Sequence, residues 1–383
     1  MSSARPLVGM KVLEIGHSVA APYAGMILGE LGADVVKLEN PGQGDYARGW
    51  GPPFSGDTAT AFHVFNRAKR GIVADLADEA TRARVRRLII EEMDVVLHNL
   101  KPGAPDKLGL GPAGLLAEKP SLIFCNIGAF GAQGPLNGLP GYDPLMQAFG
   151  GLMSMLGEDG RPPVRVPISV MDLGTGMWTV IGILAAHAER GRTGLGGVVD
   201  TSLFETSCAW MGLPIANYLA SGNLPVRAGS GVAEIVPYQA FACADGHLMI
   251  AAGNDNLFRK LCAVIGRPEL ADDPRFAKNA GRVENRGAII DILSAALLLD
   301  TRAAWQAKLE AVGVPCGPVQ TLDQVLEHAQ TAALGIVQTS RDGGLRTVGL
   351  PLSFDGVRPA YAVGAPGLSE HTGEVLGEAG RPI

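Results

Sequence analysis

The stretch that decides the fold is KVLEIGHSVAAPYAGMILGELGADVVKLE, residues 11–39. It opens with an apolar run at 11–16, continues with a helical pattern at 20–33 and ends with a second apolar run at 34–39. Neither run alternates apolar with polar residues, which is typical of strands whose two faces are both covered by helices. The stretch therefore predicts a strand–helix–strand unit of a parallel sheet.

The same alternation continues over the first two hundred residues. Further strands are predicted at 71–76, 94–100 and 121–128, with a charged helix at 78–93. Because a parallel strand needs a crossover connection, this order predicts an α/β fold with a doubly wound, Rossmann-like parallel sheet.

A second domain is predicted where the pattern changes near residue 225. The stretch IVPYQAFACADGHLMIAAG (235–253) indicates a short antiparallel meander that turns at ADG, and helical patterns follow it. We expect a large domain at 1–200 that is completed by about 350–383, a linker at 201–225, a small α+β domain at 226–325 and a return linker at 326–349. The stretch RTVGLPLSF (346–354) is expected to rejoin the large domain as an added strand or a packing arm.

Composition narrows the function classes. The chain has 383 residues, of which 47% are hydrophobic and 18% charged, and a net charge of −6. These values indicate a folded, two-domain protein that does not bind nucleic acid. The five cysteines are scattered without a CxxC pair and no HExxH occurs, so we expect no metal site. The N-terminus lacks a secretory pattern and the apolar stretch at 177–188 is short for a bilayer span, so we expect a cytoplasmic protein with no membrane partner.

Two basic loops and one loop–helix junction predict a site for an anionic ligand. NRAKRG (66–71) precedes a predicted strand, HNLKPGAPDKLGLG (98–111) follows one, and His17 lies at the first junction. Ligands of open α/β sheets bind beyond the carboxyl ends of the strands, where helix N-termini favour anions. The junction lacks GxGxxG, and Glu39 alone is a weak signal for a ribose-binding acid. Ordinary surface charge is the alternative for each loop, but the two loops together favour phosphate binding.

Asp172 has two possible roles. It precedes the helical pattern LGTGMW, so it suits an N-cap with the helix starting at Leu173. A carboxylate at a helix N-terminus also stays ionised and can attack an acyl carbonyl as a nucleophile. Gly174 and Gly176 would leave room for a substrate beside it. Position alone favours the cap, and no periodicity decides between the cap and the nucleophile.

Seven motifs in order make the chain resemble the family III CoA-transferases, a group that includes formyl-CoA transferase and carnitine CoA-transferase. They are GMKVLEIGHSVAAPYAGMILGELGADVVKLENPGQGD, NRAKRGIVADL, HNLKPGAPDKLGLG, IGAFGAQGPLNGLPGYDPLMQA, VMDLGTG, GRTGLGGVVDTSL and GVPCGPV. The resemblance implies a ring-shaped subunit and an obligate homodimer of two interlocked rings. It also implies coenzyme A and acyl-CoA as substrates, with a small carboxylic acid, and no tightly bound cofactor.

The resemblance assigns roles to individual residues. Asp172 would be the nucleophile, which forms a mixed anhydride with the acyl group and then an aspartyl-CoA thioester. Coenzyme A would contact residues of the first junction, the basic loops and the channel, namely His17, Ser18, Ala20, Asn40, Lys69, Asn99, Lys107 and Leu203. The acyl and acid substrates would meet Val19, Tyr142, Asp143, Gly229 and Gly231.

Departures from formyl-CoA transferase leave the acid substrate open. Pro140 replaces a basic residue, Asn40 replaces an arginine, Val19 replaces a glutamine, and the glycine-rich loop is reduced to AGSGVAE. Arg161 and Arg165 upstream of Asp172 would suit a dicarboxylate or serve as surface charges.

Three alternatives are weaker. An α-methylacyl-CoA racemase of the same fold needs two bases, and Tyr142 stands where that branch has a histidine. A nicotinamide dehydrogenase needs the absent GxGxxG. A nonenzymatic CoA-binding protein would use Asp172 only as a cap.

Overall fold

The computed structural model describes residues 5–341 and 344–377, which divide into two compact units. Unit 1 contains the residues up to Gly150, Val166–Gly212 and those from Ala329 onward. Unit 2 contains Gly151–Arg165 and Leu213–His328. The segment at 151–165, which the sequence analysis assigns to the large domain, thus packs with the second unit.

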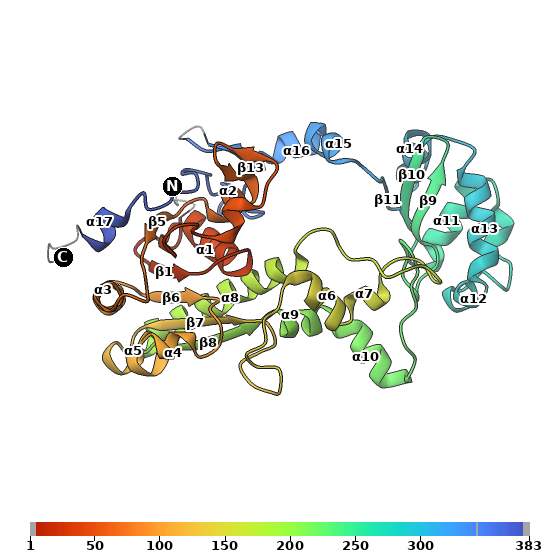
Figure 1. Cartoon of the computed structure of the whole chain (residues 1–383). Helices are drawn as coiled ribbons and strands as arrows, with labels where there is room; N and C mark the ends of the chain where they lie inside the picture. The colour runs from red at the N-terminus through yellow and green to blue at the C-terminus, as the bar shows by residue number, and fades with distance from the viewer. Residues whose placement is uncertain (1–4, 342–343, 378–383) are drawn as a thin grey trace. The chain divides into compact units, whose positions relative to one another are not determined.

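Unit 1 is built on a six-stranded parallel sheet, of which Figure 1 labels β1, β5, β6, β7 and β8. Its order is β5 (Arg70–Val73), β2 (Asp34–Glu39), β1 (Lys11–Ile15), β6 (Val95–His98), β7 (Ile123–Gly128) and β8 (Gly197–Ser202). This is the strand order of Rossmann folds, with a reversal between β1 and β6. The predicted mixed α/β fold with a central parallel sheet is confirmed.

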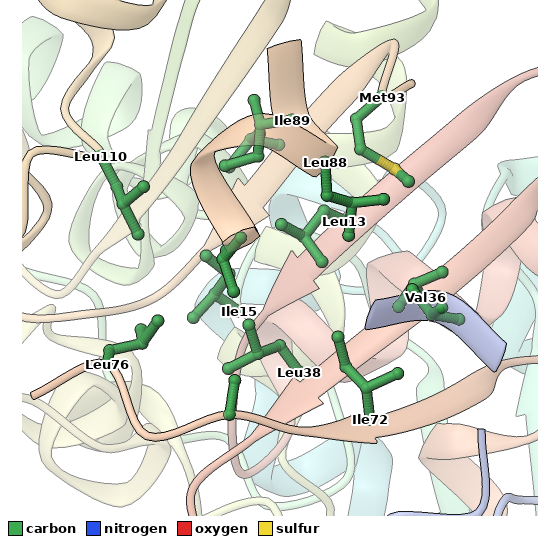
Figure 2. Packing of buried hydrophobic residues seen from close by; sticks show 14 of the residues in the cluster. Leu13, Ile15, Val36, Leu38, Ile72, Leu76, Leu88, Ile89, Met93 and Leu110 are labelled. Atoms are coloured by element: carbon green, nitrogen blue, oxygen red, sulfur yellow. The ribbon is translucent and has the colours of Figure 1, made fainter. Parts of the chain in front are cut away.

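Helices cover both faces of this sheet because both faces are apolar. On one face, Leu13, Ile15, Val36 and Leu38 pack against α3 (Glu79–Glu91), as Figure 2 shows. On the other face, α1 (Ala20–Glu30) packs along β1 and β2, and α8 (Val170–Thr193) packs along β7 and β8. Unit 1 also contains short elements: β3 (Phe54–Ser55), β4 (Thr58–Ala59), α2 (Thr60–Asn66), α4 (Ala104–Lys107), α5 (Pro112–Glu118), α6 (Asp143–Phe149), α9 (Leu203–Trp210), α16 (Ala329–Leu334) and α17 (Thr372–Leu376).

Helix α8 is longer than the apolar stretch at 177–188 suggests. Its 24 residues make it, within the described chain, the single helix long and apolar enough to cross a membrane. It lies along the sheet with Met171, Val180 and Ile183 buried, as the core helix of a folded domain does.

The chain that returns to unit 1 forms an arm. Strand β13 (Arg346–Val348) pairs antiparallel with β12 (Val337–Thr339), in a two-stranded sheet separate from the six-stranded one. Of the two alternatives predicted for 346–354, the structure thus shows the packing arm.

Unit 2 contains the predicted antiparallel meander. Strands β9 (Tyr238–Cys243) and β10 (Gly246–Ala251) form a hairpin, and β11 (Cys316–Pro318) pairs with β10. Apolar side chains of β9 and β10 pack with helices that follow. The helices are α7 (Leu152–Met155), α10 (Gly212–Ser221), α11 (Asp255–Val264), α12 (Asn279–Glu284), α13 (Arg286–Leu297), α14 (Arg302–Ala311) and α15 (Leu322–Glu327).

Candidate active site

The loop between β1 and α1 is tied to the loop after β6. The backbone N–H of His17 donates to Oδ1 of Asn99 at 3.0 Å, and Nδ2 of Asn99 donates to the His17 carbonyl at 2.8 Å. These two strands flank the point where the strand order reverses. The structure thus joins two predicted coenzyme A residues at the expected edge of the sheet.

Asp45 also fixes the conformation of the loop between β1 and α1. Its Oδ1 accepts the backbone N–H of Ser18 at 2.9 Å, and Ser18 adopts a left-handed φ of 70°. Burial lowers the pKa of the His17 imidazole, while the charge of Asp45 opposes this shift. A small cavity beside His17 is also lined by Asn40 and Leu100. The sequence analysis did not identify Asp45.

Four buried charged side chains lie next to this loop: Glu14, Lys37, Asp45 and Lys69. Nζ of Lys37 lies 3.0 Å from Oε1 of Glu14 and 2.8 Å from Oδ2 of Asp45, and it donates to the Gly16 carbonyl. Nζ of Lys69 lies 2.7 Å from Oε2 of Glu14. The two negative charges of the acids balance the two positive charges of the lysines. Buried charges are tolerated in a protein interior when they are paired in this way.

Lys69 therefore does not present its ammonium group to a ligand. Besides Glu14, it donates to the carbonyls of Pro22 and Phe65 and to Oδ1 of Asn66. Its side chain has no exposure, and burial lowers its pKa to about 8. The structure argues against the predicted phosphate contact of Lys69, because its hydrogen-bonding capacity is used inside the fold. Lys107, on α4, is exposed.

Glu39 is likewise engaged within the protein. Its carboxylate pairs with the guanidinium of Arg48 at 2.7 Å and accepts the backbone N–H of Asp45 at 2.8 Å. These contacts account for Glu39 without a ribose, in keeping with the weak signal at that position.

Asp172 lies in the first turn of α8, which starts at Val170 rather than at Leu173. Ser169 is the N-cap residue, so the expectation that Asp172 caps the helix is wrong. The backbone N–H groups of Met171 and Asp172 instead donate hydrogen bonds to Oδ2 of Asp143, at 2.6 and 3.4 Å. A carboxylate from α6 thus performs the capping role.

The Asp172 carboxyl group is free of partners. The described residues provide no hydrogen bond or ion pair to it. Removal from water raises its pKa to about 7, and the negative charge of Asp143 adds to the increase. Burial thus outweighs the helix dipole that was expected to keep Asp172 ionised. The result is an unpartnered carboxyl group that titrates near neutral pH.

The contact between α1 and α8 places Asp172 beside the first loop. A Cβ atom on Gly176 would lie 2.9 Å from the Ala20 carbonyl oxygen. Asp172 precedes Gly176 by one helical turn, so it occupies the same side of α8. Gly176 therefore serves close helix packing rather than substrate room, and Gly174 does the same against the ring of Trp210.

The remaining predicted residues differ in accessibility. Tyr142 precedes α6 and is 63% exposed. The side chains of Val19, Ala20 and Leu203 are buried. Gly229 and Gly231 belong to unit 2, where the N–H of Gly229 donates to the Gly157 carbonyl at 3.0 Å and Gly231 closes a turn on Ala228.

Gln147 is a site residue that the sequence analysis missed. It is completely buried, and its Nε2 donates to Oδ1 of Asp143 at 2.6 Å. The signal was present in DPLMQ, because an acid and an amide four residues apart meet on one side of a helix.

Comparisons with known proteins agree on one family. The family described as CoA-transferase family III matches residues 7–372. The succinate–glutarate CoA-transferase of Agrobacterium fabrum is 37% identical over 97% of this chain and 95% of its own length. The acetyl-CoA:oxalate CoA-transferase of Acetobacter aceti is 36% identical over 98% of this chain and 96% of its own. The crystal structure of a CAIB/BAIF family protein from Brucella suis superposes with a TM-score of 0.87, at 39% identity over 97% and 99% of the two chains.

Proposed function

The chain belongs to CoA-transferase family III, and from that premise we propose that it moves coenzyme A from an acyl-CoA donor to a free dicarboxylic acid through Asp172. The observation that carries the nucleophile is the unpartnered, partly buried Asp172 carboxyl, one helical turn before the close contact of Gly176 with Ala20. Support for a dicarboxylic acid comes from the relatives, whose names give succinate, glutarate and oxalate.

The reaction conserves the energy of the thioester. A carboxylate oxygen of Asp172 attacks the donor carbonyl, the C–S bond breaks, and a mixed anhydride and coenzyme A thiolate result. The thiolate attacks the Asp172 carbonyl, which forms the aspartyl-CoA thioester and releases the first acid as its carboxylate. The acceptor carboxylate attacks that thioester, its C–S bond breaks, and a second mixed anhydride and coenzyme A thiolate result. The thiolate then attacks the acceptor carbonyl of this anhydride and breaks its bond to the Asp172 oxygen. The new acyl-CoA leaves and Asp172 regains its carboxylate, so no ATP is consumed.

The oxyanion of each step needs donors other than those of α8. Asp143 occupies the N–H groups of Met171 and Asp172, and the N–H of Leu173 donates to the Ser169 carbonyl. In α1, by contrast, the N–H groups of Ala20 and Ala21 have no acceptor in the described part of the chain. They are the donors that this mechanism would use for an oxyanion or a phosphate.

We further propose a homodimer held by apolar surface that one chain leaves exposed. On α8, Met177, Trp178 and Ile181 are each between 44% and 51% exposed. Exposed apolar clusters of this kind mark protein interfaces.

The test combines a substitution with chemical trapping. Asp172→Asn removes the nucleophile without changing side-chain size, so we expect the transfer rate to fall at least about a thousandfold while coenzyme A binding persists. Wild-type protein incubated with succinyl-CoA and then hydroxylamine should carry a hydroxamate at Asp172 in mass spectrometry. Asp291→Asn, on the exposed surface of α13, is the matched control. Transfer at the wild-type rate by the Asp172→Asn variant would refute the covalent route.

A further inference from the structure

We propose that Gln147 is a positioning residue for the transfer reaction, because it holds Asp143 and the chain at Val166 so that Asp143 fixes the first turn of α8. This inference rests on the proposed function, since the group that is positioned is the Asp172 carboxyl. Gln147 does not itself touch substrate, because its side chain is completely buried.

The amide of Gln147 connects α6 to the chain that precedes α8. Its Nε2 donates to Oδ1 of Asp143 at 2.6 Å and to the Val166 carbonyl at 3.2 Å, and its Oε1 accepts the Val166 N–H at 2.9 Å. The segment that begins at Val166 leads directly into α8. A single side chain therefore determines where the chain enters α8 and which way the Asp143 carboxylate faces.

Asp143 completes the connection to the nucleophile. Its Oδ1 is bound by Gln147 and its Oδ2 by the N–H groups of Met171 and Asp172, and the residue is 2% exposed. Both oxygens are thus engaged within the protein. This geometry gives Asp143 a different role from the predicted substrate contact, because little of the carboxylate is left for a substrate.

The same arrangement places one negative charge next to Asp172. Helices α1, α6 and α9 and strands β7 and β8 pack against α8. Of the titratable groups on these elements, Asp143 acts on Asp172 and raises its pKa. The other titratable groups on these elements are Tyr23, Glu30, Cys125, Asp200, Glu205 and Cys208.

Two variants of the holoenzyme test this role. Gln147→Met keeps the volume and removes the amide, so we expect kcat to fall about a hundredfold while the KM for acyl-CoA stays within a factor of about three. In the double variant Asp143→Asn/Gln147→Glu, the new amide donates to the new carboxylate, which accepts the Val166 N–H. The carboxylate cannot donate to the Val166 carbonyl, a bond that Gln147 makes at 3.2 Å, so recovery is partial. The double variant should recover at least about a tenth of wild-type kcat.

The pH profile distinguishes positioning from a general loss of structure. Because the double variant moves the negative charge one helical turn away from Asp172, the acid limb of its kcat profile should shift to lower pH by about one unit. Gln306→Met is the matched control, since Gln306 also donates to a carboxylate one turn away, Oε1 of Glu310 at 2.7 Å. We expect this control to behave like wild type.

The outcomes separate the two proposals. A wild-type enzyme that turns over without label on Asp172 overturns the proposed function and this inference with it. A labelled wild type together with wild-type kcat in Gln147→Met overturns the positioning role alone. If Gln147→Met fails to fold, the double variant decides. Recovery with a shifted acid limb supports the role, and a folded double variant without recovery contradicts it.

Discussion

At the scale of single residues, the properties of Asp172 predict a pH dependence of catalysis. Its pKa near 7 means that about half of the enzyme carries the protonated, non-nucleophilic form at neutral pH. We expect kcat/KM for acyl-CoA to rise with pH through an apparent pKa of about 7 and to level off above it. Steady-state rates between pH 5 and 9 measure this, and a flat profile over that range would contradict it.

The same pKa predicts that Asp172 reduces stability. The pKa of Asp172 is higher in the folded protein than in the unfolded chain, so the folded state binds more protons between pH 4 and pH 7. The cost of ionising the buried carboxyl is therefore absent in acid and complete above pH 7. Asp172→Asn removes this cost, so we expect it to raise the free energy of unfolding by about 4 kcal/mol at pH 8. The difference in Tm between variant and wild type should shrink at pH 5, and a difference independent of pH would argue against this origin.

The two lysines predicted to bind phosphate should now behave differently. Lys69→Met leaves Glu14 with one buried partner in place of two, so we expect a loss of about 3–5 kcal/mol of stability, visible as a lower Tm. Lys107→Met removes an exposed charge, so Tm should be unchanged while the Kd for coenzyme A rises about tenfold. Calorimetric titration and thermal melts measure both quantities. Weaker binding by Lys69→Met at unchanged Tm would restore Lys69 as a ligand.

Local sequence could predict where the site lies but not which side chains face it. The first junction and the loop at 98–111 were identified because ligands of open α/β sheets bind beyond the carboxyl ends of the strands, whatever the strand order. The burial of Lys69 depends on Glu14 and Lys37 from two other strands, a pairing that no local pattern encodes. The capping of α8 by Asp143 was missed for the same reason, since the two positions are 29 residues apart.

At the scale of helices and strands, Gly176 sets the contact between α1 and α8. Alanine normally stabilises a helix interior by about 1 kcal/mol relative to glycine. At Gly176 the added Cβ would lie 2.9 Å from the Ala20 carbonyl and 3.0 Å from the Tyr23 ring, so α1 must move. We expect Gly176→Ala to destabilise the protein by about 2 kcal/mol and to lower coenzyme A affinity, because the loop at His17 moves with α1.

Gly191 in the same helix is the control for that substitution. No atom lies within 4 Å of the position that its Cβ would take, so Gly191→Ala should follow the ordinary propensity and raise Tm slightly. If packing against α1 determines the effect, thermal melts should show a lower Tm than wild type for Gly176→Ala and a higher Tm for Gly191→Ala. Equal signs would show that the α1–α8 contact is not as close as described.

Strands were easier to predict than the division into units. The segment predicted at 34–39 matches β2, because Val35, Val36 and Leu38 mark a buried strand and the chain after Glu39 is rich in glycine and polar residues. Strand β8 was recognised only within a family motif, since its sequence GVVDTS has two apolar residues only. It lies at the edge of the sheet, where its residues alternate between more and less exposed positions. The segment at 151–165 packs with unit 2 through the bridge between Glu158 and Ala228, a contact between distant positions that composition does not indicate.

At the scale of the whole molecule, one chain leaves several large apolar side chains exposed. In α10, all of which the structure describes, none of the ten residues is buried, although it contains Leu213, Ile215, Tyr218 and Leu219. Helices in proteins are stabilised mainly by packing their apolar face against other parts of the structure. An α10 whose apolar side chains remain in water lacks this stabilisation. A second copy of the chain is the partner that the proposed dimer supplies.

This surface predicts how assembly and activity depend on each other. We expect the wild type to sediment at twice the chain mass of 39.8 kDa at micromolar concentration. Leu213→Glu/Leu219→Glu places two charges on side chains that are 71% and 77% exposed in one chain, so a monomer tolerates them while a buried interface does not. The variant should dissociate and lose transfer activity together, whereas Leu299→Glu, at a side chain 84% exposed, should do neither. Sedimentation velocity and transfer assays on the same samples measure both effects. A double variant that stays dimeric and active would show that α10 is not part of the interface, and a monomeric, active wild type would refute the dimer itself.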